Sequence, residues 1–398
     1  MVNTRGVARL GMLAVGLGIG AGWAHTPVAA ADSSTDWLSS IDGLLSGALP
    51  AADPSGLNLA ISFDGMSLVH DGNATATTAS GEYGLAIAYG DGASATAEGG
   101  TGNYALADGT NAEAGAGGAA GSSGNNFDSA IDIGNNADAV TDHDYNGAYA
   151  GAGSLLGGEG GTGGGSYNTA IDIGNNASGT LEDGAHAGAG GLEGLGDDGN
   201  HNFAIDIGNN SNGTGQGADA VGGDYNSGSF NTAIDIGNNG TGASQDGAHA
   251  GSGGLEGLGD DGNHEFAFDF GNNSNGFAEG AVSVGGNNDI ASYLGNATND
   301  GTNGHWAYAG FGDNDIANVV GNNSYAFSGG GFDPAVVGNN DIATVFDPFG
   351  TLGSTAVAGE GFDVPGNFDL AAVFGDGFDT FPGATGGNFL VEILPTLF

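Results

Sequence analysis

The sequence predicts an all-β protein, a repetitive β-solenoid or β-roll, and three observations lead to this prediction. Glycine supplies 86 of the 398 residues. The phrase A-[IF]-D-[IF]-G-N-N occurs five times between residues 126 and 280. The block "DGAHAGAGGLEGLGDDGNH" at 183–201 returns at 246–264 with one change, an offset of 63 residues. β-Branched segments that recur with Gly and Asn corners are typical of solenoids. A Gly-rich chain can also be disordered in part or throughout, but five copies of a strand motif favour the fold.

Residues 1–31 have the features of a secretory signal peptide. Arg5 and Arg9 precede the apolar stretch 10–22, and Ala29-Ala30-Ala31 stands before Asp32 as a small-residue cleavage site. This order of charge, apolar run and small residues directs export, and the run is shorter than the roughly 20 residues of a membrane-spanning helix. We therefore expect a secreted or cell-envelope protein whose mature chain begins at Asp32.

The charge of the chain limits its partners. The formal net charge is −45. Removing 1–31 removes two Arg and no Asp or Glu, which gives −47 and leaves no Lys or Arg. Such a surface repels phosphate backbones and anionic headgroups, so nucleic acids and electrostatic membrane binding are poor partners. The chain also has no cysteine, so stability must come from hydrogen bonds, packing and ions from solution.

Residues 32–80 read as a cap made of an N-terminal helix and a β-hairpin. Within 33–50, apolar residues at Trp37, Leu38, Ile41, Leu44 and Leu45 share one helical face. An alternating apolar segment then runs into a two-residue Asp-Gly turn at 64–65, which is a strong hairpin signal.

The main repeats occupy residues 81–280. Ala86 and Ala105 are equivalent positions 19 residues apart, and each unit is a strand, a Gly corner and a second strand of small residues. The aspartates of the five phrases follow at steps of 40, 34, 29 and 34; they are Asp132, Asp172, Asp206, Asp235 and Asp269. The offset of 63 is the sum of two such steps, so we interpret it as a duplication of two coils.

Strand alternation puts the two isoleucines of A-I-D-I on one face and Ala and Asp on the other. We expect Ile inward, Asp outward, and ladders of Asn at the Gly-Asn-Asn corners.

Residues 281–398 form a second repeat region with a C-terminal cap. N-D-I-A recurs at 288–291, 314–317 and 340–343, in steps of 26, and Asp369-Leu370-Ala371 is a looser copy. The last segment, "NFLVEILPTLF", is strongly apolar. We expect it to cover the last coil, because terminal repeats must seal an exposed core.

The A-I-D-I-G-N-N phrases and the alanine-glycine run 185–191 resemble the exported Gly/Asn-rich repeat proteins of mycobacteria and their relatives, and specifically the PGRS portions of the PE-PGRS family. No PE domain precedes them here; the signal peptide stands in its place. "LAIAYGDGASATA" (85–97) and "TAIDIGNNASG" (169–179) are also similar to the left-handed β-roll heads of trimeric autotransporter adhesins. That resemblance implies a trimer, so a homo-oligomer is among the expected partners.

Catalysis finds little support in the residues. The chain beyond residue 31 has no Lys, Arg or Cys and no G-x-S-x-G elbow. Aspartates that recur identically in coil after coil indicate architecture rather than one active site. We therefore predict that the protein is not an enzyme, and a polysaccharide-active enzyme is the distant alternative.

Two sets of residues are candidate metal ligands. The aspartates at 132, 172, 206, 235 and 269 offer the hard oxygen ligands that Ca²⁺ prefers. Asp183 with His186, and Asp246 with His249, have a spacing that suits a divalent metal, although a duplication also copies exposed loop residues. We expect cations to stabilise the fold.

The function predicted from the sequence is that of an exported, non-enzymatic surface protein of the cell envelope, cell wall or extracellular space, structural or adhesive. Its expected contact is an envelope polymer or a host factor, through a repetitive acidic face. A calcium- or cation-binding β-roll module is the alternative.

Overall fold

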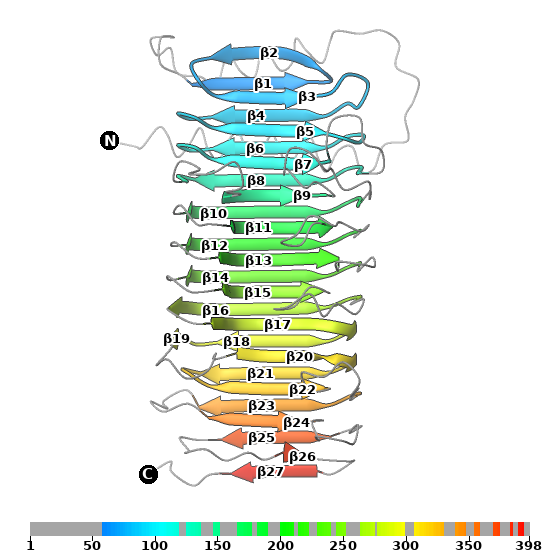
Figure 1. Cartoon of the computed structure of the whole chain (residues 1–398), viewed down its shortest axis with the longest axis vertical. Helices are drawn as coiled ribbons and strands as arrows, with labels where there is room; N and C mark the ends of the chain where they lie inside the picture. The colour runs from blue at the N-terminus through cyan, green and yellow to red at the C-terminus, as the bar shows by residue number, and fades with distance from the viewer. Residues whose placement is uncertain are drawn as a thin grey trace, which may run out of the picture.

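The structure is a two-sheet β-solenoid (Figure 1), seen in a computed structural model. The part of the chain that it describes comprises residues 58–118, 125–136, 146–151, 165–176, 181–189, 200–210, 214–222, 229–239, 244–251, 263–274, 277–298, 306–329, 339–347, 354–358, 369–374, 383–384 and 389–393. Throughout these residues the regular elements are strands. The signal peptide and the helix predicted within 33–50 lie outside them.

The strands belong to two sheets, which we name A and B. Sheet A contains β1 (Leu59–Phe63), β2 (Met66–Asp71), β4 (Leu85–Tyr89), β6 (Tyr104–Asp108), β8 (Ser129–Gly134), β10 (Thr169–Asn176), β12 (Phe203–Asn210), β14 (Thr232–Asn239), β16 (Phe266–Ser274), β18 (Ile290–Leu294), β19 (Ala297–Thr298), β21 (Ile316–Gly321), β23 (Ile342–Asp347), β25 (Leu370–Phe374) and β27 (Phe389–Ile393). Sheet B contains β3 (Thr75–Thr78), β5 (Ser94–Glu98), β7 (Glu113–Gly117), β9 (Asn146–Ala150), β11 (Leu181–Ala189), β13 (Thr214–Gly222), β15 (Ser244–Gly251), β17 (Phe277–Asn287), β20 (Trp306–Asp313), β22 (Tyr325–Gly329), β24 (Thr355–Ala358) and β26 (Gly383–Ala384).

The chain alternates between the sheets, so each coil adds one strand to each. Successive coils stack along the long axis, from the blue N-terminal strands to the red C-terminal ones (Figure 1). Neighbouring strands within each sheet are parallel from β4 onward. The first two strands are the exception. The turn Asp64-Gly65 has positive φ at both residues (48° and 77°) and joins β1 and β2 as the predicted antiparallel hairpin.

The register places repeated residues directly on one another. Ala86 pairs with Ala105, which confirms the 19-residue unit. The five A-[IF]-D-[IF]-G-N-N phrases occupy adjacent strands with identical positions aligned. The three N-D-I-A segments and the looser copy at 369–371 align in the same way, and β27 pairs with β25 as the last strand of sheet A.

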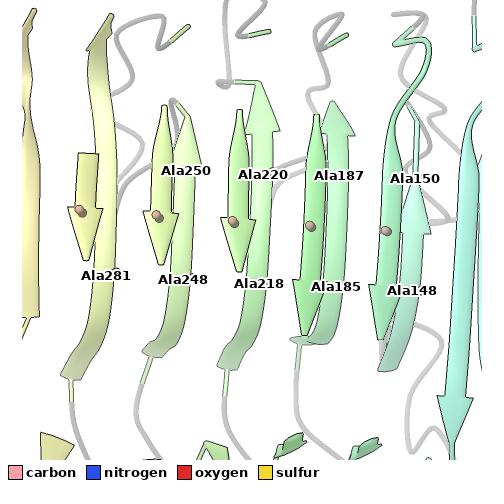
Figure 2. Close-up of a cluster of buried hydrophobic side chains, with 14 of the residues drawn as sticks. Ala148, Ala150, Ala185, Ala187, Ala218, Ala220, Ala248, Ala250 and Ala281 are labelled. Atoms are coloured by element: carbon pink, nitrogen blue, oxygen red, sulfur yellow. The ribbon is translucent and has the colours of Figure 1, made fainter. Parts of the chain in front are cut away.

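Alanine fills the space between the sheets. The alanines of successive sheet A strands, such as Ala170 and Ala204, are completely buried. Figure 2 shows the same arrangement in sheet B, where alanines from β9, β11, β13, β15 and β17 form rows across the strands. They belong to one continuous cluster with the sheet A alanines.

The predicted orientation of the A-I-D-I strands is therefore wrong. Alanine and aspartate point inward, with Asp172 only 1% exposed. The isoleucines point outward, and Ile173 and Ile207 are 37% and 38% exposed. The physical reason is local size: in these coils the alanines of sheet B and the glycines opposite the aspartates leave no room for inward rows of isoleucine. Later coils accept larger side chains at the aspartate position, where Tyr293, Val319, Val345 and Val373 are completely buried.

Glycine at the end of each A-I-D-I strand is required by the close approach of the next coil. A Cβ added at Gly208 would lie 1.4 Å from the carbonyl oxygen of Gly237. The glycines at 134, 174, 237 and 271 face the same contact at 1.4–1.5 Å.

We predict that Gly208→Ala destabilises the protein by at least about 3 kcal/mol, because the backbone of two coils must separate. The control is Gly81→Ala. Gly81 has φ +86° but nothing within 4 Å of an added Cβ, so its cost is only the conformational strain of about 1–2 kcal/mol. Urea unfolding of both variants measures the difference. Equal losses would contradict the close packing of coils at this corner.

Candidate functional site

The five candidate calcium ligands form one buried column. Asp132, Asp172, Asp206, Asp235 and Asp269 occupy the same register position in β8, β10, β12, β14 and β16, and each is at most 1% exposed. In four of the phrases the second Asn of Gly-Asn-Asn turns inward and its Nδ2 donates to Oδ2 of the aspartate. The distances are 2.8 Å for Asn136–Asp132, 2.5 Å for Asn176–Asp172, 2.6 Å for Asn210–Asp206 and 2.6 Å for Asn239–Asp235.

Glycines in sheet B make room for this column. A Cβ added at Gly217 would lie 2.9 Å from Oδ2 of Asp206 and 2.2 Å from the carbonyl oxygen of Gly184. The equivalent glycines at 147, 184, 247 and 280 face Asp132, Asp172, Asp235 and Asp269 in the same way. The narrow interior therefore accepts a carboxyl group on one sheet only because the other sheet lacks a side chain there.

Burial changes the acidity of these groups. It raises the pKa of Asp172 and of Asp235 to about 7. Burial also raises the pKa of Asp132 well above its ordinary value, and the neighbouring Asp172 raises it further. A neutral carboxyl avoids the large cost of an unpaired charge in the interior.

A second buried column lies at the corner that leads into sheet A. Each backbone N–H donates to the side-chain oxygen of the equivalent residue in the previous coil. Asn168 N donates to Asp128 Oδ1 at 2.9 Å, and Asp341 N donates to Asp315 Oδ1 at 2.9 Å. The column runs through Asp128, Asn168, Asn202, Asn231, Glu265, Asp289, Asp315, Asp341 and Asp369.

Beyond Asp128, this corner column changes from amide to acid along the chain. The middle coils use Asn, and the later coils use Glu or Asp at the same position. Burial, followed by the neighbouring Asp289, raises the pKa of Asp315 to about 9. Burial, followed by the neighbouring Glu265, raises the pKa of Asp289 to about 9.

These positions correct the expected acidic face. The five aspartates face the interior, so the outward row of carboxylates predicted from the sequence is wrong. Among the residues with defined positions, no group of three or more His, Cys, Asp or Glu could hold a metal ion. Calcium binding by these aspartates stays a prediction.

The two histidine pairs lie in sheet B. Asp183 and His186 belong to β11, and Asp246 and His249 belong to β15. The register puts Asp219 of β13 between the two histidines, which the spacing along the chain does not reveal. His186 stacks on Tyr149 with ring centroids 5.3 Å apart. A divalent metal at these residues stays a prediction.

The sequence interpretation missed a stack of exposed rings at the corner of sheet A. The aromatic corner, as we name it, consists of Phe127, Tyr167, His201, Phe230 and His264. Their ring centroids lie 5.3, 4.9, 4.7 and 5.0 Å apart in that order, and the planes are inclined by at most 19°. All five side chains are exposed. Each stands three positions before the Ala of its A-[IF]-D-[IF] phrase, a regularity that could have revealed the stack.

The aromatic corner is not needed to close the coil. Its residues have φ between +59° and +63°, a region that is unfavourable for bulky side chains. In later coils the equivalent positions are Asn288, Asn314 and Asn340, with φ of 62°, 64° and 61°. Asn tolerates this conformation and makes the same corner, so closing the coil does not require the rings.

Comparison with protein-family models, with curated proteins and with solved structures found no match. No helix long and apolar enough to cross a membrane occurs in the residues that the structure describes.

We predict that the protein is most stable in mild acid. Below about pH 4 the buried carboxyls are protonated in both the folded and the unfolded chain. As the pH rises towards the folded-state values of about 7 for Asp235 and about 9 for Asp315, only the unfolded chain ionises freely, so stability falls. We expect the melting temperature to drop by on the order of 10 °C between about pH 5 and about pH 9.

The variant Asp315→Asn isolates this effect, because Asn168, Asn202 and Asn231 already occupy equivalent positions. It should melt like the wild type below about pH 4 and above it at about pH 9. Asp91→Asn, at an exposed site, controls for the loss of one charge. An equal loss of stability for Asp315→Asn at both pH values would show that the carboxyl is not held neutral.

Proposed function

We propose that the protein is exported and acts, without catalysis, as a structural or adhesive component of the cell envelope or extracellular surface. The observation that carries this proposal is the aromatic corner. It presents five exposed rings at a regular spacing on a rigid stack of coils, and large exposed aromatic side chains are typical of binding surfaces.

The position of the carboxyl groups favours this function over a polysaccharide-active enzyme. A glycosidase needs two carboxyls that reach the substrate. Here the repeated aspartates are buried between the sheets and hydrogen-bonded to asparagine in coil after coil. Their regular recurrence supports a role in the architecture.

The chemistry around the aromatic corner indicates what it can bind. The neighbouring ladder contains uncharged side chains such as Asn200, Ser229 and Asn263, which bond from coil to coil. In the sequence, Asp197-Asp198 and Asp260-Asp261 shortly precede the two histidines of the corner. A neutral or basic partner fits this surface, and the net charge of −45 disfavours anionic ones.

The expected partner is therefore an envelope polymer or a host factor that is not anionic. The resemblance to PGRS regions and to β-roll heads of adhesins supports the same assignment, and a cell-wall location is part of the proposal. Export rests on residues 1–31, which we propose are removed before Asp32.

The test is expression of the full chain in a bacterium, followed by sedimentation of the exported protein with insoluble envelope material. We expect the mature protein outside the cytoplasm with Asp32 as its first residue. The double variant Tyr167→Asn/Phe230→Asn should bind about tenfold more weakly, as for lost interface aromatics, and should still fold because later coils use Asn there.

The matched control is Tyr83→Asn, which also replaces an exposed tyrosine with positive φ (54°) but lies outside the five-ring stack. It should bind like the wild type. Wild-type binding by the double variant would refute the aromatic corner as the contact, and a cytoplasmic, uncleaved protein would refute export.

A further inference from the structure

A second surface of the molecule begins two residues beyond the aromatic corner in the chain. In β10, Thr169, Ile171, Ile173 and Asn175 face away from sheet B, whereas Ala170, Asp172 and Asn176 are buried. The same alternation continues in β12, β14, β16, β18, β21 and β23, and in β25 with the difference that the outward Ala372 is buried. We name the outward side of these eight strands the uncharged face, because none of its outward positions is Asp, Glu, His, Lys or Arg.

This face is apolar as well as uncharged. One row runs through it from Ile173 to Phe374 and consists of Ile, Phe, Leu and Val in register. Leu294 and Phe346 in this row are 51% and 47% exposed. The adjacent row changes from Ile and Phe to Ser292, Asn318 and Thr344 in the later strands. Polar side chains are therefore compatible with this sheet, and the strand structure alone does not require the apolar row.

The dimensions of the uncharged face match a protein–protein interface. Eight strands at about 4.8 Å spacing give a length of about 34 Å, and seven residues along a strand give a width of about 20 Å. The footprint is about 700 Å², close to the roughly 800 Å² that each partner contributes to a standard interface.

Charge decides which partner this face can accept. The chain carries 47 Asp and Glu, and its two Arg lie in the first nine residues. A second copy therefore offers no Lys or Arg from the body of the protein to pair with a buried carboxylate. Strands of sheet B carry acidic residues, including Glu113, Asp219 and Glu279. On the uncharged face two copies can meet without burying a single carboxylate.

We propose that the uncharged face binds the same face of a second copy, which gives a two-fold symmetric dimer of sheet A against sheet A. Both partners then have the same spacing between strands, so the apolar rows of one copy fit between those of the other over the whole length. Sheet B, whose strands carry these acidic residues, lies on the side away from the contact. Salt strengthens the dimer by screening the repulsion between the two acidic bodies.

Sedimentation analysis of the full chain tests the proposal. We expect a dimer at about 100 μM protein and about 0.15 M salt, with a larger dimer fraction at higher salt. Ile173→Asp/Ile207→Asp should raise the dissociation constant at least about tenfold, because the new carboxylates find no cation in the partner. Met66→Asp/Tyr83→Asp is the matched control, since these side chains are also about half exposed (50% and 52%) but lie outside the face.

Crosslinking gives a second test that does not depend on the stability of the Asp variants. The chain has no cysteine, so a single introduced Cys can form a disulfide only between copies. Ile173→Cys, Phe270→Cys and Phe374→Cys sample the two ends and the centre of the apolar row. Parallel copies should crosslink at all three positions, and antiparallel copies at Phe270→Cys alone.

A monomer at all concentrations, a trimer, or an absence of crosslinks at all three positions would overturn the proposal. So would a monomer that binds neutral phosphatidylcholine vesicles, because the face would then belong to a lipid surface. The variants used here leave the aromatic corner intact, so envelope binding and dimer formation fail separately.

Discussion

The thinness of the space between the two sheets governs the rest of this structure. Both sheets line that space with alanine, and these side chains are almost completely buried. Each coil contributes little apolar area by itself, so stability comes from repeating the same contacts from coil to coil. Parallel pairing then places equivalent residues on top of one another, and every side chain in the repeat must be compatible with its own copies above and below.

Each residue of A-I-D-I-G-N-N has a role under this constraint. The alanine fills the interior, and the isoleucines turn outward because the alanines and glycines of sheet B leave no room for them in these coils. The aspartate fits inside only opposite a sheet B glycine and bonded to the second asparagine, as in Asp206 with Asn210 at 2.6 Å. The first asparagine forms an exposed ladder, in which Asn175 Nδ2 donates to Asn209 Oδ1 at 2.6 Å.

The same constraint decides which side chains are buried and which reach the surface. Carboxyl groups that would be reactive or metal-binding at the surface are enclosed and held near neutrality, whereas the apolar side chains are displaced to the outside. The outer surface consequently has an uncharged apolar face and an edge of stacked rings, on a protein that is strongly acidic overall. These two surfaces, rather than the aspartates, are the parts of the molecule best suited to contact others.

Much of the fold could be predicted from the sequence because equivalent residues of successive repeats pair with one another in adjacent strands. The spacing of Ala86 and Ala105, the Asp64-Gly65 turn and the aligned phrases all lead to the observed strands. The direction in which the strands face could not be predicted from alternation, which is symmetric between Ile inward and Asp inward. The small residues of sheet B opposite these strands decide that question, and only the folded structure brings them together. The aromatic corner was missed for a similar reason, since His201 and Phe230 become equivalent only when the coils stack.

The central claim is that the repeated aspartates are enclosed in this interior, where burial raises the pKa of Asp132, Asp172 and Asp235 well above its ordinary value. Carbon-13 NMR of the carboxyl groups, in the full chain labelled at aspartate, measures their titration directly. Enclosed aspartates should form a distinct set of resonances that titrates above about pH 6, whereas exposed aspartates titrate near their ordinary value of about 3.9. Titration of every aspartate near that ordinary value would contradict the account.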